Sequence, residues 1–395
     1  MIDKKFTSEA ITEDHSKYGQ CIGRRTNMYK KDDDIRSEFS RDYNRILHST
    51  AFRRMKHKTQ VFYATENDHI CTRIEHVYHV EAVTRTICET LGLNAELGVA
   101  MALGHDLGHA PFGHEGEKVI NKLTKKHLGT TFWHEQNSLR MIDEIETLPD
   151  LEGNQHLLNL TYAVRDGIIS HCGEVDEEAL QPRDEAIDLK EIQRPNQFQP
   201  YTWEGCVVKI ADKIAYLGRD IEDALRLRIL SHDQIKELNR IVSSRYPGTV
   251  DAVLTTTIMH NFIINLCETS SPEAGMRFDK KQFELMKDIK AFNYEYIYRH
   301  ERINRFNAYV DLVLNSVFDY LMEGFDRIQK GQEYRSFFER SYHKWLEYFD
   351  KANKYARNPI YDLSNDLHKT ESILIYIARM SDHYAIKFYN GLIRF

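Results

Sequence analysis

Hydrophobic residues recur along this chain at the three- and four-residue steps that place side chains on one face of a helix. The clearest run lies within residues 72–90 and consists of Ile74, Val77, Val80, Val83 and Ile87. A second run, within residues 210–224, consists of Ile210, Ile214, Leu217, Ile221 and Ala224. Residues 94–107 form a shorter apolar segment, and residues 134–146 an amphipathic one that stops before Pro149. Each of these four segments is predicted to be a helix.

The rest of the chain divides into further helical stretches and a few breaks. Residues 34–64 predict a helix with a cluster of basic side chains, and residues 280–395 predict helices rich in aromatic and charged residues. Residues 173–202 hold three prolines, many carboxylates and no helical period, so we expect a loop or insertion with a solvated acidic surface. Breaks are expected near 247–248 and 270–275. Because no strand-like alternation of any length occurs, the predicted fold class is all-α.

Composition supports a folded helical protein and excludes several other classes of protein. Of the 395 residues, 42% are hydrophobic and 29% charged, with only 8 prolines and 19 glycines. These values exclude disordered, collagen-like and coiled-coil chains. The formal net charge of −7 argues against a protein that coats DNA, although it leaves room for a local basic pocket.

Cysteine spacing and hydropathy indicate where the protein works. The 6 cysteines are scattered without a C-x-x-C pair, which fits a reducing compartment better than a disulfide framework or a zinc ribbon. The first residues are polar, and no stretch approaches the roughly 18 continuous apolar residues of a membrane span. We therefore expect a soluble, cytoplasmic protein with no membrane partner.

Histidines give the strongest indication of chemistry. Five of the 19 histidines lie between residues 105 and 134, and residues 102–117 read Ala-Leu-Gly-His-Asp-Leu-Gly-His-Ala-Pro-Phe-Gly-His-Glu-Gly-Glu. The adjacent His105 and Asp106, at the end of an apolar helix, direct an imidazole nitrogen and a carboxylate oxygen to one point. Such a mixed donor set suits Mn, Fe, Mg or Zn, because no thiolate is present to select a softer metal.

A metal site needs further ligands, and two other predicted helices offer them. His76 lies on the helix predicted at 72–90, and Asp212 is expected to open a later helix. On that later helix Asp212, Tyr216 and Asp220 step by four residues and share the face opposite the apolar stripe.

Each of these features alone has an ordinary explanation, since most single histidines are core or surface residues and most acidic stripes are solvated. We assign that ordinary role to His48, His79, His127 and His171. The conjunction of His76, the His105-Asp106 pair and Asp212 favours a metal pocket.

The order of these residues resembles that of the HD superfamily of metal-dependent phosphohydrolases. More narrowly, the chain resembles the deoxynucleoside triphosphate (dNTP) triphosphohydrolases, which include the bacterial dGTPase-like enzymes and the vertebrate SAM-and-HD-domain enzyme. The likeness covers residues 36–225. It is carried by F-R-R-M-K-H-K-T-Q-V from Phe52, T-R-I-E-H ending at His76, H-D-L-G-H-A-P-F-G-H-E-G-E from His105, H-E-Q from His134, and D-K-x-x-Y-x-x-R-D from Asp212. A weaker likeness near the end is A-R-M-S-D-H-Y, which finishes at Tyr384.

The resemblance implies an organisation, a cofactor and a reaction. It implies an all-α HD core at residues 36–230, preceded by an arm at 1–35 and followed by a C-terminal helical region at 231–395 packed on the core. It implies a divalent ion, Mn, Mg or Fe, held by His76, His105, Asp106 and Asp212. The implied reaction hydrolyses dGTP, and other dNTPs as well, at the α-phosphorus to deoxynucleoside and inorganic triphosphate.

The resemblance also implies roles for other side chains. The departing 5′-oxygen needs a proton, for which we assign His114 held by Glu117, with His134 as the second candidate and His109 beside them. Arg73 and Lys213 look like phosphate ligands. Gln60, Tyr216 and Asp220 look like sugar-reading residues, and Tyr384 joins this substrate-binding set. A further group is expected on a solvated face or subunit contact: Arg53, Arg54, Lys56 and Lys58.

Departures from the family pattern and the choice of partners leave alternatives open. Arg219-Asp220 and His134-Glu135 stand where many bacterial members carry His-Asp and His-Asn, so strict dGTP preference stays open. Family members are usually homo-oligomers, which implies a tetramer or hexamer with nucleotide effectors between subunits. The alternative functions are another HD phosphohydrolase (a 5′-nucleotidase or alarmone hydrolase) and a protein that binds nucleotides or single-stranded nucleic acid with little turnover.

Overall fold

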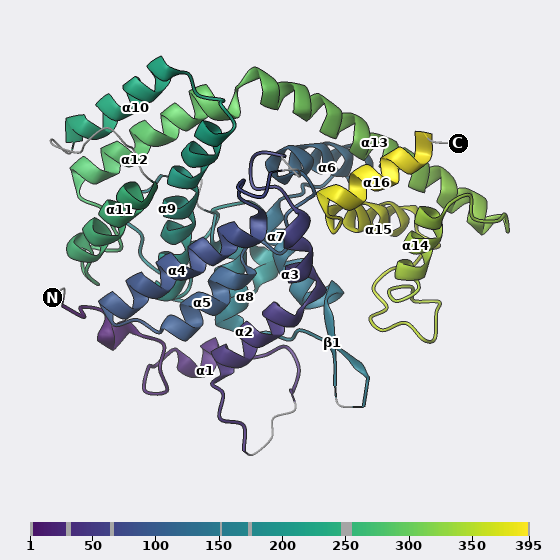
Figure 1. Ribbon diagram of the computed structural model, residues 1–395. Coiled ribbons are helices and arrows are strands. Elements are labelled where there is room, and N and C mark those ends of the chain that lie inside the picture. Colours follow the sequence, from purple (N-terminus) through teal and green to yellow (C-terminus); the bar gives the residue numbers. More distant parts are fainter. Residues whose placement is uncertain are drawn as a thin grey trace.

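Figure 1 shows the computed structural model of the chain, in which helices make up almost all of the regular structure. It describes residues 3–28, 33–63, 67–150, 152–172, 176–245 and 255–393. The α-helices are α1 (Tyr18–Cys21), α2 (Glu38–His48), α3 (Thr50–Arg54), α4 (Arg73–Leu91), α5 (Ala95–Gly104), α6 (Gly113–Leu128), α7 (His134–Arg140), α8 (Tyr162–Ser170), α9 (Trp203–Arg226), α10 (His232–Arg245), α11 (Thr255–Thr269), α12 (Lys280–Phe292), α13 (Glu301–Gln329), α14 (Phe337–Leu346), α15 (Asp366–Ala378) and α16 (Asp382–Ile393).

Short elements complete the structure. The 3₁₀ turns are η1 (Thr7–Glu9), η2 (Met55–His57) and η4 (Leu189–Glu191), and the π turns are η3 (Met141–Ile145) and η5 (Asn293–Tyr298). Within the described residues the one sheet is an antiparallel hairpin of β1 (Thr147–Pro149) and β2 (Gln155–Leu157). The predicted all-α class is confirmed, and this small hairpin is the exception that the hydrophobic pattern did not indicate.

The described residues form two apolar cores. The first is built around α4, α5, α8 and α9, with α2, α10, α11 and α12 packed against it. The predicted stripe of α4 is its buried face, through Val77, Val80, Val83 and Ile87. A capping box of Thr72 and Glu75 begins this helix, and Gly92 ends it with a φ of +85°, a left-handed conformation that suits glycine. Because burial of this stripe fixes the rotation of α4 about its axis, it also fixes the position of His76, which faces Asp212 of α9.

The second core joins α6 to the C-terminal helices α13, α14, α15 and α16. Val119, Ile120 and Leu123 of α6 are buried there together with apolar residues of α13 and α15. Residues of α10–α12 thus pack in the first core, and residues of α6 pack in the second core with the C-terminal helices.

Several predicted boundaries are wrong. The helix predicted at 34–64 is broken into α2, α3 and η2, because Ser49 adopts an extended ψ of 153° and caps α3 by accepting a hydrogen bond from the Phe52 N–H. Asp212 does not open its helix: α9 begins at Trp203, where Thr202 caps it, and every residue from Trp203 to Ala211 is buried. Asp212 therefore lies in the middle of a helix.

Other expectations about the chain can be compared with the described residues. The break expected at 270–275 is confirmed between α11 and α12, whereas Pro247-Gly248 lies outside the described residues. The part of 173–202 that the structure describes is irregular apart from η4. Among the described residues, no helix is both long and apolar enough to cross a membrane. All 6 cysteines are buried thiols without disulfides.

The expectation of a solvated basic face near residues 53–58 is wrong for two of its members. Lys58 is 3% exposed, and its ammonium donates to the carbonyl oxygens of His109 and Ala378. The guanidinium of Arg54 forms a 2.7 Å ion pair with the buried carboxylate of Glu146. These cations hold structural elements together, since a buried charge is stable only when it is paired or hydrogen-bonded.

Candidate active site

The two cores meet at a cavity of about 440 Å³. Helices α4, α9, α6, α7 and α13 and the turn after α5 line it, together with Gln60 and Val61. Most of the predicted site residues line this one cavity, namely Gln60, Arg73, His76, Asp106, His109, His114, Glu117, His134, Asp212, Tyr216 and Asp220. Residues separated by more than 150 positions in sequence are thereby brought together.

Three elements of the first core bring the predicted metal ligands close to each other. Asp212 Oδ1 lies 3.0 Å from His76 Nε2 and 3.9 Å from His105 Nε2. Asp106 Oδ1 lies 3.6 Å from His105 Nε2, and Asp106 Oδ2 lies 4.0 Å from His76 Nε2. Two imidazole nitrogens and two carboxylates therefore converge, the donor set that suits a borderline or hard divalent cation.

The environment of His105 supports a role in binding a cation. Its Nδ1–H donates to the carbonyl oxygen of Ala102 at 2.7 Å, which leaves the lone pair on Nε2. Nε2 is buried and, among the described residues, has no hydrogen-bond partner. A buried imidazole nitrogen without a partner costs free energy unless something binds it. The residues present therefore fit a metal ion.

His171, to which we assigned an ordinary role, also lines the cavity. Its ring lies edge-on to that of His105, with 4.9 Å between the centroids, and its Nδ1–H donates to the Ile168 carbonyl oxygen at 2.6 Å. Burial and the neighbouring His105 lower the pKa of His171 to about 3, so it is neutral at physiological pH. Nothing in its local sequence indicates this, because the contact depends on how α8 packs against α5.

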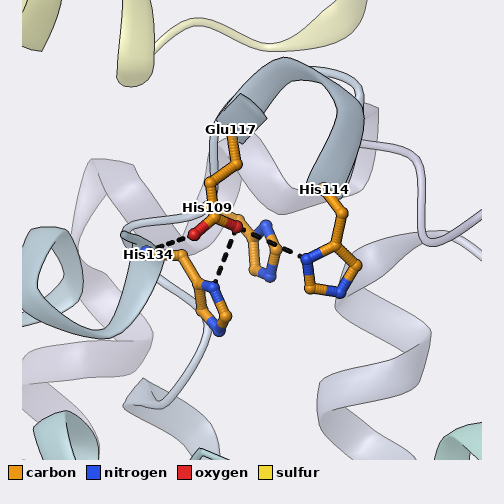
Figure 2. A group of neighbouring side chains, drawn as sticks. All are labelled: His109, His114, Glu117 and His134. Carbon is orange, nitrogen blue, oxygen red and sulfur yellow. Dashed lines mark hydrogen bonds and ion pairs between the residues drawn. The ribbon is translucent and has the colours of Figure 1, made fainter. Parts of the chain in front are cut away.

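A second cluster of ionisable side chains lies on the α6 side of the cavity (Figure 2). Glu117 Oε2 lies 3.1 Å from His134 Nδ1 and 3.4 Å from His114 Nδ1. The ring of His109 stacks on that of His134, with 4.0 Å between the centroids. His109 Nε2 lies 3.5 Å from Asp106 Oδ1, so this cluster adjoins the metal-ligand group.

Electrostatics give the members of this cluster different charges. Burial opposes the charged form of His134, but the carboxylates of Glu135 and Glu117 outweigh it and raise the pKa of His134 to about 10. Despite its own burial, Glu117 has a pKa held well below its usual range by the charges of His134 and His114. Burial, with Arg73 nearby, holds the pKa of His109 well below its usual range. At neutral pH His134 is therefore cationic, Glu117 anionic and His109 neutral.

Arg73 lies at the base of the cavity and is almost fully buried. Its guanidinium forms an ion pair with Asp106 and donates to the carbonyl oxygens of Thr59 and Gln60. Gln60 lines the cavity, and its side-chain oxygen is buried without a hydrogen-bond partner among the described residues. The guanidinium of Arg73 is thus held by its partners, whereas the side-chain oxygen of Gln60 is available to a polar ligand in the cavity.

Asp220 and Tyr216 line the cavity on the α9 side, as their four-residue spacing predicts. Tyr298, which sequence reasoning missed, donates its hydroxyl to Asp220 Oδ2 at 2.5 Å. Burial raises the pKa of Asp220 to about 7 even though this hydrogen bond opposes the rise. The chain supplies no local signal for the pairing, because Tyr298 belongs to the distant π turn η5.

Two predicted substrate-binding residues do not line this cavity. Lys213 lies beside a separate small cavity, and its ammonium donates to Asp176 Oδ1 at 2.9 Å. One residue along a helix rotates the side chain by about 100°, which turns Lys213 away from the face of Asp212. Tyr384 packs against Phe338 and shares a 3.1 Å hydrogen bond with the hydroxyl of Tyr376, inside the C-terminal region.

Comparison with known proteins agrees with this geometry. Residues 73–217 match the HD domain, and residues 276–344 match the phosphohydrolase-associated domain. A "Deoxyguanosinetriphosphate triphosphohydrolase-like protein" of Caldanaerobacter subterraneus subsp. tengcongensis is 34% identical over 91% of this chain and 86% of its own length. The chain belongs to this family of HD-domain phosphohydrolases.

Other members of the family show the same breadth of similarity. The relative from Desulfatibacillum aliphaticivorans is 36% identical over 75% of this chain and 77% of its own length. The relative from Rickettsia bellii is 29% identical over 90% of this chain and 92% of its own length. Both are likewise named deoxyguanosinetriphosphate triphosphohydrolase-like proteins. The matched HD domain spans all four predicted metal ligands, so the family assignment and the observed cluster refer to the same part of the molecule.

Proposed function

We propose that the protein hydrolyses deoxynucleoside triphosphates, dGTP and others, to a deoxynucleoside and inorganic triphosphate with a divalent metal ion. The observation that carries this proposal is that a group of potential metal ligands and a carboxylate–histidine cluster meet at one cavity. The metal-ligand group of His76, His105, Asp106 and Asp212 adjoins the carboxylate–histidine cluster through the 3.5 Å approach of His109 to Asp106. Hydrolysis of a phosphate ester with a poor leaving group needs both activation of water and delivery of a proton.

His76, His105, Asp106 and Asp212 would hold the metal. When bound, a divalent cation supplies the acidity that makes water a nucleophile at neutral pH and neutralises part of the phosphate charge. Around it, the chain's own residues fix the ligands: Ala102 orients His105, and Arg73 holds Asp106. Such surrounding partners set the orientation of metal-binding side chains. The identity of the ion, Mn, Mg or Fe, is part of the proposal.

The proton for the departing 5′-oxygen comes from the cluster around Glu117. In the reaction, the oxygen of water forms a bond to the α-phosphorus and gives up a proton to solvent. The bond between the α-phosphorus and the 5′-oxygen breaks, and the 5′-oxygen takes a proton from the cluster. His114 is the proposed donor, because Glu117 contacts its ring and it opens toward the cavity with a half-exposed side chain. His134, with a pKa of about 10, serves better as a fixed positive charge beside the phosphates.

Recognition of the substrate is assigned to the remaining lining residues. Arg73 would contact phosphate, while Gln60, Tyr216 and Asp220 would contact the sugar. A carboxylate of Asp220 positioned by the Tyr298 hydroxyl is suited to accept a hydrogen bond from a 3′-hydroxyl. Lys213 and Tyr384 are given no role in substrate binding, because Lys213 is hydrogen-bonded to Asp176 and Tyr384 to Tyr376. A cytoplasmic location, a homo-oligomer and a nucleotide effector remain part of the proposal through the family.

Product analysis tests this function. Purified protein is incubated with each dNTP and each NTP in the presence of Mn²⁺, and the products are separated by anion-exchange chromatography. We expect deoxynucleoside and triphosphate in equal amounts. Pyrophosphate or orthophosphate would instead indicate another HD phosphohydrolase, and salt-sensitive binding of single strands without turnover would indicate a binding protein.

A further inference from the structure

The carboxylate of Asp382, at the start of α16, holds two backbone segments that border the cavity. Its Oδ2 accepts a hydrogen bond from the backbone N–H of Thr59 at 2.7 Å, and its Oδ1 accepts one from the backbone N–H of Phe112 at 2.8 Å. Asp382 is 1% exposed and does not line the cavity. Asp382 therefore affects the shape of the cavity only through the two backbone segments that it binds.

The first segment supports the metal-ligand side. The backbone N–H of Thr59 donates to Asp382, and the carbonyl oxygen of Thr59 accepts a hydrogen bond from Arg73 Nε at 3.3 Å. Arg73 in turn forms the ion pair with Asp106. Gln60, the next residue, lines the cavity. A shift of this segment would move a predicted metal ligand and a predicted sugar contact together.

The second segment supports the carboxylate–histidine cluster. Phe112 precedes α6 with a φ of +65°, a left-handed conformation that costs free energy for a residue with a side chain. The hydrogen bond that the Phe112 N–H donates to Asp382 offsets that cost and fixes the direction in which α6 begins. His114 and Glu117 lie in the first two turns of this helix. The starting direction of α6 therefore sets where the imidazole of His114 and the carboxylate of Glu117 point.

A third contact joins the same parts of the chain. The buried ammonium of Lys58 donates to the carbonyl oxygen of His109 and to that of Ala378, at the end of α15. Residues 58–60 and 109–113 are thus tied to each other and to the turn between α15 and α16. The second core, to which α6 belongs, is in this way joined to the first core directly beside the reacting groups.

We propose that Asp382 is a positioning residue for the reaction, through which the C-terminal helices set the geometry of the Thr59–Gln60 segment and of the first turns of α6. This inference rests on the proposed function and extends it to a residue outside the cavity. It predicts that the C-terminal region affects turnover as well as stability. A displacement of reacting groups by about 1 Å lowers rates by as much as about 10²-fold.

The test compares Asp382→Asn with Glu339→Gln. The asparagine keeps the shape of the side chain but offers one acceptor oxygen, so one of the two N–H groups loses its partner. Glu339 is a matched control, because it is also a fully buried carboxylate that accepts a backbone N–H, that of Arg335 at 2.6 Å, and a guanidinium N–H from Arg327. Both hydrogen-bond donors to Glu339, Arg327 and Arg335, lie within the C-terminal region and not beside the cavity.

Both variants are assayed with dGTP and Mn²⁺ at a temperature well below their unfolding transitions. We expect Asp382→Asn to lower kcat by about 10- to 100-fold while KM changes much less, and Glu339→Gln to lower Tm while leaving kcat unchanged. Equal losses of kcat in the two variants, or none in Asp382→Asn, would overturn the proposal.

Amide hydrogen exchange provides a readout that needs no activity. Faster exchange at Thr59 or Phe112 is expected in Asp382→Asn and not in Glu339→Gln, measured on the full-length proteins. Unchanged protection at both amides in Asp382→Asn would contradict the positioning role. A wild-type protein that fails to hydrolyse any dNTP would contradict the proposed function alone, because the exchange comparison still reports whether Asp382 holds the two segments.

Discussion

Glu117 holds His134 by two separate hydrogen bonds. Its Oε1 accepts from the backbone N–H of His134 at 3.0 Å, and its Oε2 accepts from the ring Nδ1–H at 3.1 Å. The same Oε2 lies 3.4 Å from the ring of His114. One carboxylate thus fixes the start of α7 and orients two imidazoles that border the same cavity (Figure 2).

The assignment of His114 as the acid predicts a loss of rate without a loss of binding. His114→Ala should lower kcat by about 10²- to 10⁴-fold, the usual contribution of a general acid, while metal content and dNTP affinity stay close to wild type. Steady-state kinetics and elemental analysis measure the two quantities. A His114→Ala protein without metal, or one with near wild-type turnover, would leave His134 as the next candidate.

Glu117→Gln should have a smaller effect on kcat and a visible effect on the pH–rate profile. Without the anion, the protonated imidazoles lose their partner, so their pKa values fall and the acid is deprotonated at a lower pH. The basic limb of the profile should therefore move to lower pH. An unchanged basic limb would show that Glu117 does not set the pKa of the general acid.

Stability should also depend on pH through His134. Its pKa is about 10 in the folded protein against 6.5 for the free side chain, so the folded state binds the extra proton between these values. The stabilisation is complete below pH 6.5 and is lost as the pH rises toward 10. The free energy of unfolding of metal-free wild type, minus that of His134→Gln, should fall over this range by up to about 5 kcal/mol at 1.36 kcal/mol per pKa unit. Denaturant titrations at pH 6.5 and 9.5 measure it, and a difference that grows with pH would contradict the charged state of His134.

The metal-ligand assignment predicts that Asp106→Ala and Asp212→Ala each abolish metal content and activity together. Each change removes an anionic ligand from a set of four. Asp223→Asn is a control on the same helix as Asp212, because Asp223 accepts a hydrogen bond from the Cys71 N–H outside the cavity. Elemental analysis should find metal in the control only; one equivalent of metal in Asp212→Ala would show that the ligand set is wrong.

Tyr216 is predicted to exclude a 2′-hydroxyl. Tyr216→Ala should open space beside the sugar and lower the ratio of kcat/KM for dGTP over GTP. Tyr78→Ala is a suitable control, because Tyr78 is 43% exposed on α4 and does not line the cavity. A ratio that stays the same in Tyr216→Ala would remove this residue from sugar discrimination.

Gly108, inside the H-D-L-G-H motif, is predicted to be intolerant of any side chain. A Cβ there would lie 2.0 Å from the backbone nitrogen of Ser138, because the turn after α5 packs directly on α7. Gly108→Ala should therefore lower Tm by several degrees, since it forces apart two segments that carry His105 and His134. Gly19→Ala, where nothing lies within 4 Å of the added Cβ, should leave Tm nearly unchanged in the same thermal scan.

The sequence predicts those parts of the site whose geometry is local. The His105-Asp106 pair and the Asp212, Tyr216 and Asp220 stripe follow from adjacency and helical period. The structure places Asp106, Asp212, Tyr216 and Asp220 on the lining of one cavity, with His105 next to Asp106 and Asp212. Contacts that depend on how helices pack against each other cannot be predicted from spacing along the chain. His171 reaches His105 only through the packing of α8 on α5.

Hydrogen bonds between distant segments escape sequence reasoning for the same reason. Tyr298 meets Asp220, and Asp382 meets Thr59 and Phe112, across separations that no periodic pattern records. Helix boundaries were missed where a cap decided them, at Ser49 and Thr202. Lys213 shows the remaining limit, since its neighbour Asp212 lines the cavity and its own side chain turns to Asp176.

Hydrolysis of dGTP in ¹⁸O-labelled water with Mn²⁺ tests the central claim most directly, with the products identified by mass spectrometry. Attack of water on the α-phosphorus with departure of the 5′-oxygen predicts one ¹⁸O atom in the triphosphate and none in the deoxyguanosine. Labelled deoxyguanosine, or deoxyguanosine monophosphate released with pyrophosphate, would contradict the account.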